Sequence, residues 1–182
     1  HARTKDPQCV DLICDRECYA DICEAAKRSG NAFVIGYVKL LIDTINLKTF
    51  VRARKMGQPW SFFGTVFISG GDISEKVFVS GYEEPVAQFA ARLEGTALKK
   101  AAEEGLASMK ETGSFTDIER LCDDALMDYV KDAKYISFGI EPLIAYMAAK
   151  QAEIRCVRIV LAGKAAGLAP NLIRERLRET YG

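Results

Sequence analysis

The interval between Pro142 and Gly163 contains neither proline nor glycine, and most of its residues are apolar. Because globular helices commonly end at such residues, the interval predicts one long α-helix. Four charged residues fall within nine positions at its centre: Lys150, Glu153, Arg155 and Arg158. A transmembrane helix needs about 20 consecutive apolar residues, so these charges exclude a membrane span. We expect the helix to be the spine of a helical bundle.

Seven residues of this helix follow one another in steps of four and three, as in a coiled coil. They are Leu143, Met147, Lys150, Ile154, Val157, Leu161 and Lys164. At 100° per residue, Arg155 and Arg158 project about 140° and 80° away from Lys150. Glu153 lies on the other side of Lys150, at the spacing of an i,i+3 ion pair.

These charges have two interpretations. In the first, the long side chains simply reach solvent at the bundle surface. In the second, they form an exposed, partly basic surface that meets a partner protein. The candidate partner-binding residues are Lys150, Glu153, Arg155 and Arg158.

Helix signals also dominate the rest of the chain. A first helix is expected to begin with Asp6 as N-cap and Pro7 as the first helical residue, and to end at Gly30. A second helix then runs to Gly57. The next segment, 60–85, has short apolar runs between glycines and no regular alternation, so it predicts short helices and turns. Its aromatic residues are expected to anchor it to the core: Trp60, Phe62 and Phe63.

Two more helices are expected near the C-terminus. One begins with a capping box formed by Thr116 and Glu119. Its apolar positions share one face: Ile118, Leu121, Cys122, Ala125, Leu126, Tyr129 and Val130. A final helix begins at Pro170. No segment predicts a strand, so the fold class is all-α, a multi-helix bundle.

The sequence also contains an internal similarity. Phe33–Lys55 aligns without gaps with Pro142–Lys164. The identical pairs are Ile35/Ile144, Tyr37/Tyr146, Ile45/Ile154, Val51/Val160, Ala53/Ala162 and Lys55/Lys164. This similarity predicts two related helical units stacked in series, 1–81 and 82–182, with the boundary near Gly81.

Charge and histidine content exclude several functional classes. Lysine plus arginine equals aspartate plus glutamate at 25 each, which argues against a dedicated nucleic-acid binder. His1 is the only histidine, so histidine-based triads and His-rich zinc sites are excluded. Gly163-Lys164 lacks the flanking residues of a phosphate-binding loop.

The six cysteines lack the two-residue gaps of zinc knuckles and redox pairs. They are Cys9, Cys14, Cys18, Cys23, Cys122 and Cys156. We interpret them as small buried apolar residues of a reducing compartment, with metal binding or redox chemistry as alternatives.

The remaining carboxylates do not suggest a catalytic site. Asp123, Asp124 and Asp128 lie opposite the apolar face of their helix, which predicts a solvated face. No nucleophile, base and oxyanion site come together in the sequence. We therefore expect no catalytic residue, no metal and no cofactor.

The C-terminal end contains a series of short motifs at Gly139 to Pro142, Ala145-Tyr146, Ala149-Lys150, Glu153 to Arg155, Arg158-Ile159 and Gly163-Lys164. With these motifs the sequence closely resembles the C subunit of archaeal and bacterial A/V-type ATP synthases, the homologue of the d subunit of the eukaryotic vacuolar ATPase. An earlier family segment is matched by Ile42-Asp43, Asn46 and Arg52. Family members are longer, with a further helical unit at the N-terminus, so this chain is expected to be a C-terminal fragment.

The resemblance implies a non-catalytic role. The C subunit caps the cytoplasmic side of the proteolipid ring, receives the D and F subunits of the central shaft, and passes torque between shaft and ring, for proton or sodium transport. The implied location is cytoplasmic, peripheral at the inner face of the cell membrane. Two other hypotheses stay open: a soluble helical adaptor or regulatory module, and a thiol enzyme built on the helix with Cys9 to Cys23.

Overall fold

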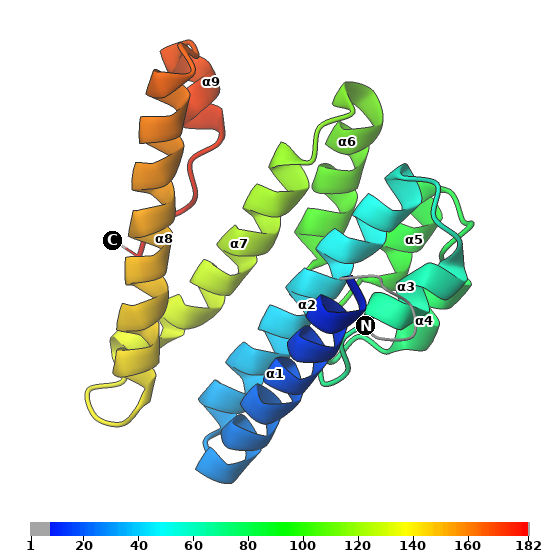
Figure 1. The fold of residues 1–182 in the computed structure, drawn as a ribbon. Helices are drawn as coiled ribbons and strands as arrows, with labels where there is room; N and C mark the ends of the chain where they lie inside the picture. Colours follow the sequence, from blue (N-terminus) through cyan, green and yellow to red (C-terminus); the bar gives the residue numbers. More distant parts are fainter. Residues whose placement is uncertain (1–7, 182) are drawn as a thin grey trace. The chain divides into compact units, whose positions relative to one another are not determined.

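The computed structural model describes residues 8–181, and within this range the chain forms helices, turns and loops without a strand (Figure 1). The all-α class is therefore confirmed. The chain divides into two compact units, His1–Glu84 and Pro85–Gly182. A kinship between the units and their stacking in series stay predictions.

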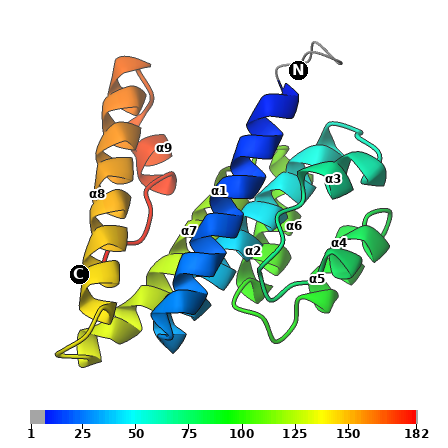
Figure 2. The ribbon, with the colours of Figure 1, turned by 60° about the horizontal axis from the view of Figure 1, so that its bottom comes forward.

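The first unit is built on a helical hairpin. Helices α1 (Gln8–Ser29) and α2 (Ala32–Lys55) lie side by side in both ribbon views (Figures 1 and 2). Gly30 joins them with a φ of 63°, a conformation that glycine adopts without strain. Asn31 caps α2, because its side-chain oxygen accepts a hydrogen bond from the backbone N–H of Val34 at 3.0 Å. The predicted end at Gly30 is confirmed, and the predicted start at Asp6 and Pro7 lies outside the described residues.

Two short helices, α3 (Trp60–Val66) and α4 (Glu75–Ser80), complete this unit, as predicted for its glycine-rich segment. Its core is aromatic: the rings of Phe63 and Phe78 lie 5.5 Å and 5.4 Å from the ring of Phe50. All three are fully buried. Phe63 thus anchors α3, as expected. The same expectation is wrong for Trp60, which is exposed, because it begins the helix at the surface one turn before the core position.

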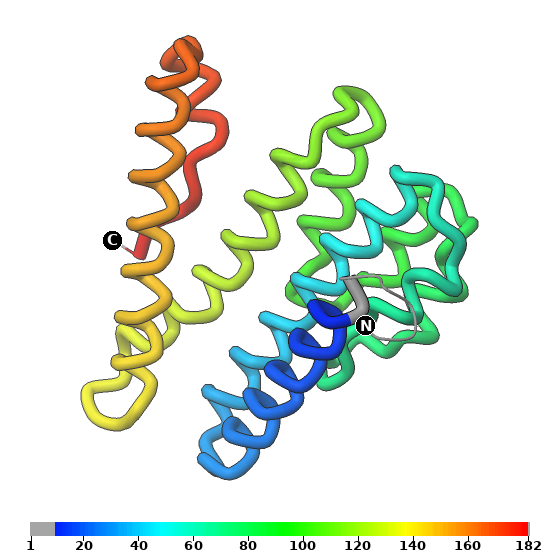
Figure 3. Tube along the Cα trace, in the orientation of Figure 1, coloured from blue at the N-terminus to red at the C-terminus, as the bar shows by residue number. Residues whose placement is uncertain are grey.

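The second unit begins with three short elements: α5 (Val86–Arg92), the π-helical turn η1 (Ala101–Gly105) and α6 (Leu106–Thr112). It continues with α7 (Thr116–Lys131), the 3-10 turn η2 (Asp132–Tyr135), α8 (Glu141–Ala165) and α9 (Pro170–Glu175). Gly105 allows the π-helical turn to approach α7 closely, since a Cβ atom there would lie 2.7 Å from the Cα of Ile118. Figure 3 shows the chain turning back after α8, so that the last residues run alongside this helix.

Helix α7 matches its prediction in extent but not at its start. Thr116 is the first helical residue, and no side chain caps the helix from the N-cap position. The backbone N–H of Thr116 instead donates to the hydroxyl of Ser114 at 3.2 Å. The predicted capping box is therefore wrong. On the predicted apolar face the fully covered residues are Ile118, Leu121, Cys122 and Val130, and the other three are half-buried.

Helix α8 forms over the predicted interval, but it is not the buried spine that its apolar sequence suggests. Its buried residues are Ala145 and Gly163. Gly163 lies against Ile173 of α9, whose Cγ1 would be 2.7 Å from an added Cβ atom. Within the second unit, α8 packs mainly against α7, η2 and α9, on one side. The large apolar side chains on its other side are exposed. No helix in the described part of the chain is long and apolar enough to cross a membrane.

Candidate protein-interaction surface

The exposed side of α8 carries a row of apolar side chains that is interrupted by one lysine, Lys150. We call this row the α8 stripe, and it consists of Leu143, Met147, Lys150, Ile154, Val157 and Leu161. Its five apolar residues are 52% to 62% exposed. The stripe lies on the opposite side of the helix from Ala145 and Gly163, about 160° away on average at 100° per residue. Such a contiguous apolar surface is typical of a protein-interaction site.

Two of the predicted partner-binding residues form an ion pair within this surface. Lys150 Nζ donates to a carboxylate oxygen of Glu153 at 2.7 Å, so the predicted i,i+3 pair is confirmed. This hydrogen bond is the main cause that raises the pKa of Lys150. The ammonium group also lies 5.7 Å from the ring centroid of Tyr146, which is exposed as well. Both members of the pair are about half exposed, so they remain accessible to a partner.

The two arginines of the prediction have different surroundings. Arg155 forms an ion pair with Asp123 of α7 at 2.6 Å, which ties α8 to the neighbouring helix. Arg158 is exposed and forms no ion pair with a residue that the structure describes. Arg158 therefore has its guanidinium group available at the edge of the α8 stripe, whereas Arg155 already has a structural role.

Asp123 and Asp124 correct the predicted solvated face of α7. The side chain of Asp123 is only 10% exposed, because Arg178 covers it and donates to its carboxylate at 2.7 Å. The backbone N–H of Glu179 donates to Asp124 at 2.8 Å. The C-terminal segment thus crosses the acidic face of α7, a contact between residues far apart in the sequence. Asp128 is solvent-exposed, as expected.

Buried polar side chains of α2 fix the loop that follows α3. Asp43 accepts hydrogen bonds from the backbone N–H groups of Asp72 and Ile73 at 3.0 Å and 3.1 Å. Asn46 bonds both backbone groups of Ile68, donating to its carbonyl at 2.8 Å and accepting from its N–H at 3.0 Å. Gly71 packs so closely on Asp43 that a Cβ atom would overlap with the carboxylate. In the described part of the chain no buried side-chain polar atom lacks a hydrogen-bond partner, so these residues satisfy one another and serve the fold.

Burial raises the pKa of the Asp43 carboxyl, and the N–H groups of Ile73 and Asp72 oppose this rise by stabilising the charged form. Lys39 lies nearby and forms an ion pair with Asp72 at 2.7 Å. Sequence reasoning named Asp43 and Asn46 only through the family resemblance. Two polar residues three positions apart within an apolar helix were the signal that could have revealed this role.

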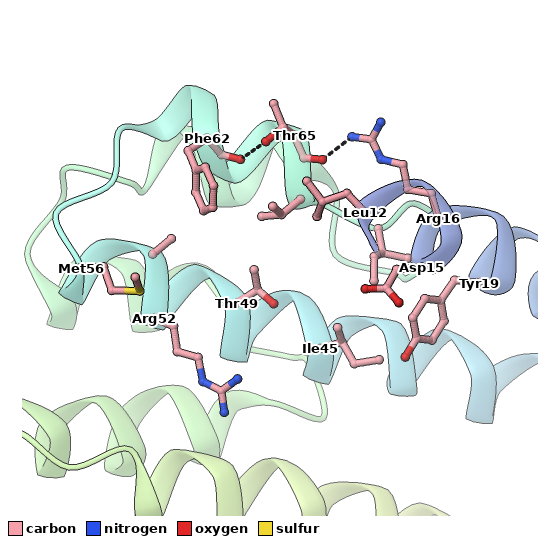
Figure 4. A pocket seen from close by; sticks show the side chains of 13 residues that line it. Leu12, Asp15, Arg16, Tyr19, Ile45, Thr49, Arg52, Met56, Phe62 and Thr65 are labelled. Carbon is pink, nitrogen blue, oxygen red and sulfur yellow. Dashed lines mark hydrogen bonds between the residues drawn. The ribbon is translucent and has the colours of Figure 1, made fainter. Parts of the chain in front are cut away.

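A pocket of about 310 Å³ lies between α1, α2 and α3 of the first unit (Figure 4). Leu12, Asp15 and Tyr19 of α1 and Ile45 of α2 line it, and Arg52 lies at its edge with its guanidinium group directed away from α1. Arg16 closes one side by donating to the carbonyl of Thr65 at 2.6 Å. The lining residues offer no nucleophile with an adjacent base, so the pocket does not have the features of an active site.

The cysteines differ from their prediction. Cys122 is buried, as expected, whereas Cys14 and Cys18 are exposed on α1, and the side chain of Cys9 lies outside the described part. The prediction fails for Cys14 and Cys18 because α1 is covered on one side only. Among the described residues, no three His, Cys, Asp or Glu side chains are placed to hold a metal ion.

Comparison with known proteins gives a consistent result. Residues 1–176 match the family model described as ATP synthase (C/AC39) subunit. The chain is 25% identical over 174 residues to the C subunit of the V-type sodium ATPase of Enterococcus hirae, covering 96% of this chain and 52% of that protein. It is 24% identical over 157 residues to the C subunit of the A-type ATP synthase of Halobacterium salinarum, covering 84% and 44%.

A third relative is the C subunit of the A-type ATP synthase of Methanothermobacter thermautotrophicus, which is 26% identical over 155 residues, covering 78% of this chain and 38% of that protein. The chain therefore spans about half the length, or less, of the curated relatives that it matches. No solved structure is significantly similar to it.

Proposed function

Because the chain belongs to the ATP synthase (C/AC39) subunit family, we propose that it is a non-catalytic central-stalk subunit of a V/A-type rotary ATPase. In this role it couples the central shaft, formed by the D and F subunits, to the proteolipid ring of the membrane sector. The transported ion is a proton or sodium, and that choice belongs to the ring. The protein itself lies on the cytoplasmic side, peripheral to the cell membrane.

The observation that carries this proposal is the family match over residues 1–176, together with relatives named as C subunits of A-type and V-type complexes. A coupling subunit needs stiffness and interaction surfaces rather than reactive groups. Two observations support this role: Asp43 and Asn46 hold a loop on α2 through hydrogen bonds, and the α8 stripe is exposed. An enzyme would instead need convergent polar groups in a cleft.

The test is co-purification of the full-length protein from detergent-solubilised membranes. We expect the proteolipid ring and the shaft subunits to be recovered with it. Recovery of the protein alone, without any membrane component, would support a soluble adaptor and overturn the coupling role.

A charge reversal at the α8 surface sharpens this test. Arg158→Glu changes an exposed residue without a described ion pair, so we expect weaker recovery of the complex with unchanged helicity. Arg155→Glu is the less clean variant, because it also places a second carboxylate beside Asp123. A complex of normal composition with Arg158→Glu would remove this arginine from the candidate interface while leaving the coupling role intact.

A further inference from the structure

Helices α2 and α8 are similar in sequence, but the face of α8 that carries the stripe and the aligned face of α2 differ in how they are covered. In the alignment of Phe33–Lys55 with Pro142–Lys164, the α8 stripe corresponds to Val34, Val38, Leu41, Ile45, Lys48 and Arg52 of α2. In α2 most of this face is covered: Val34 and Val38 are buried, and Leu41, Ile45 and Lys48 are half-buried. Ile45 lines the pocket beside α1 (Figure 4), and Arg52 at the end of the face is exposed. In α8 the corresponding face is open to solvent.

Helix α1 therefore shows what kind of element fits this face. It runs antiparallel to α2, since a turn at Gly30 joins the two helices, and Leu12 and Tyr19 are the larger apolar side chains that it directs toward α2 (Figure 4). A helix in the same position on α8 would place its own apolar side chains between Leu143 and Leu161, along almost the full length of the stripe. Apolar residues in alternating steps of four and three form a seam along one side of a helix, and a second helix packs along such a seam.

The charges of the two helices in this hairpin are complementary. Helix α1 has five acidic residues, Asp11, Asp15, Glu17, Asp21 and Glu24, against three basic ones. The C-terminal half of α2 is basic, with Lys48, Arg52, Arg54 and Lys55. The C-terminal half of α8 is also basic beside its stripe, where Arg158 and Lys164 are both exposed.

We propose that the α8 stripe binds an acidic amphipathic helix of another polypeptide, packed antiparallel to α8 as α1 packs on α2. Met147, Ile154 and Val157 form the centre of the contact, and Arg158 and Lys164 attract carboxylates at its edges. Lys150 and Glu153 neutralise each other in the middle of the stripe at 2.7 Å, which leaves the basic edge to select the partner. This inference does not require the coupling role, because it concerns the helix that the surface accepts in any complex.

The probes for the test are fluorescently labelled helical peptides of the length of α1, 22 residues. The acidic peptide has leucines in steps of four and three with glutamates beside them, and the basic peptide has lysines in place of the glutamates. A third peptide keeps the glutamates and replaces the leucines with glutamine. Binding to the whole chain is measured by fluorescence anisotropy at low and at high salt.

We expect the acidic peptide to bind at least about tenfold more tightly than either other peptide, with a smaller preference at high salt. Met147→Asp combined with Val157→Asp should weaken binding by about tenfold or more, since both residues lie at the centre of the contact. The matched control is Ile13→Asp, which places the same charge at an exposed apolar residue of α1 and should leave binding unchanged. Arg158→Glu should reduce the preference for the acidic peptide.

Four results would overturn the proposal. Equal binding of acidic and basic peptides would mean unselective apolar adhesion, and equal loss with Ile13→Asp would place the contact elsewhere. Absence of peptide binding to a folded, monomeric chain would show that the stripe is not a helix-binding surface. A dimer in light scattering that Met147→Asp with Val157→Asp dissociates would identify a second copy as the occupant.

Discussion

Helices α2 and α8 align without a gap, yet they lie in different environments. Eleven residues of α2 are buried, whereas only Ala145 and Gly163 are buried in α8. Where α2 has the covered Val38, α8 has the exposed Met147 at the aligned position. The two sequences are similarly apolar, so this property alone does not decide which helix becomes a core and which presents a surface. Burial depends on the elements that pack against each helix.

The polar residues of the two helices differ in the same way. Asn46 of α2 and Arg155 of α8 occupy aligned positions, and each side chain bonds to another element. Asn46 is fully buried against backbone groups of Ile68, while Arg155 is 47% exposed beside Asp123. A buried hydrogen bond and a half-exposed ion pair contribute differently to the free energy of unfolding. Four measurements on the whole chain test how far the two helices differ.

The largest difference is expected between Phe50 and Leu161. Phe50→Ala removes a ring from the buried aromatic cluster with Phe63 and Phe78 and should lower the free energy of unfolding by about 3–5 kcal/mol. Leu161→Ala on the exposed side of α8 should change it by less than about 0.5 kcal/mol. Urea unfolding followed by circular dichroism measures both. Equal losses would mean that α8 is covered in solution.

The aligned polar pair should give the next difference. Asn46→Ala leaves the N–H and carbonyl of Ile68 without their partner and should cost roughly 1–3 kcal/mol. Arg155→Ala should cost at most about 1 kcal/mol, because the ion pair is half exposed and Asp123 keeps Arg178. Urea unfolding measures the loss of free energy of unfolding for both variants. A larger loss with Arg155→Ala than with Asn46→Ala would contradict this prediction.

Asp43 should make the free energy of unfolding depend on pH. Its carboxyl pKa is raised above the ordinary value of 3.8, chiefly by burial. The folded chain therefore keeps this proton at pH values where the unfolded chain has released it. The resulting contribution of Asp43 to the free energy of unfolding is fully present below pH 3.8 and is lost as pH rises through the folded-state pKa.

Asp43→Asn should remove this slope, which is the decrease in the free energy of unfolding with rising pH that the Asp43 carboxyl causes. It should also cost about 1 kcal/mol at neutral pH, because one N–H loses its acceptor. The matched control is Glu24→Gln, which removes an exposed carboxylate paired with Arg28 and should leave the slope unchanged. Unfolding curves recorded from acid to neutral pH test this prediction, and a slope that persists in Asp43→Asn would assign it to another group.

The smallest difference concerns two identical residues, Ile45 of α2 and Ile154 of α8. Ile45 is half-buried at the pocket beside α1, so Ile45→Ala should cost about 1–2 kcal/mol, less than a fully buried isoleucine would. Ile154→Ala should stay within about 0.5 kcal/mol. A paired comparison of melting curves measures this contrast. A vanishing difference would mean that α1 covers Ile45 less than the structure indicates.

Local signals in the sequence predicted the helices well. Gly30 indicated the end of one helix, and Pro170 indicated the start of another. The charges inside the long apolar interval excluded a membrane span. The spacing of Lys150 and Glu153 indicated their ion pair. The capping box at Thr116 failed because Ser114 supplies the hydroxyl that receives the first N–H. Such a shift of two residues is not resolved by pattern alone.

The candidate surface was predicted only in part. The sequence indicated the residues of the α8 stripe, but it assigned them to a core because an apolar stripe of this spacing serves equally in a core and at an interface. The role of Asp123 was misjudged, since Arg155 and Arg178 reach it from 32 and 55 residues away along the chain. No local pattern contains such contacts.

The amino-acid sequence was sufficient to predict that this chain is helical and where most of its long helices end, because these properties follow from backbone preferences and spacing within a few residues. Its family was indicated by the resemblance of longer motifs near the C-terminus. The burial of α2, the exposure of the α8 stripe, and the roles of Asn46 and Arg155 became clear only in the folded chain, where Asn46 holds a loop and Arg155 holds a neighbouring helix. Burial and pairing are decided by neighbours distant in sequence, and two helices with the same pattern differ as soon as their neighbours do.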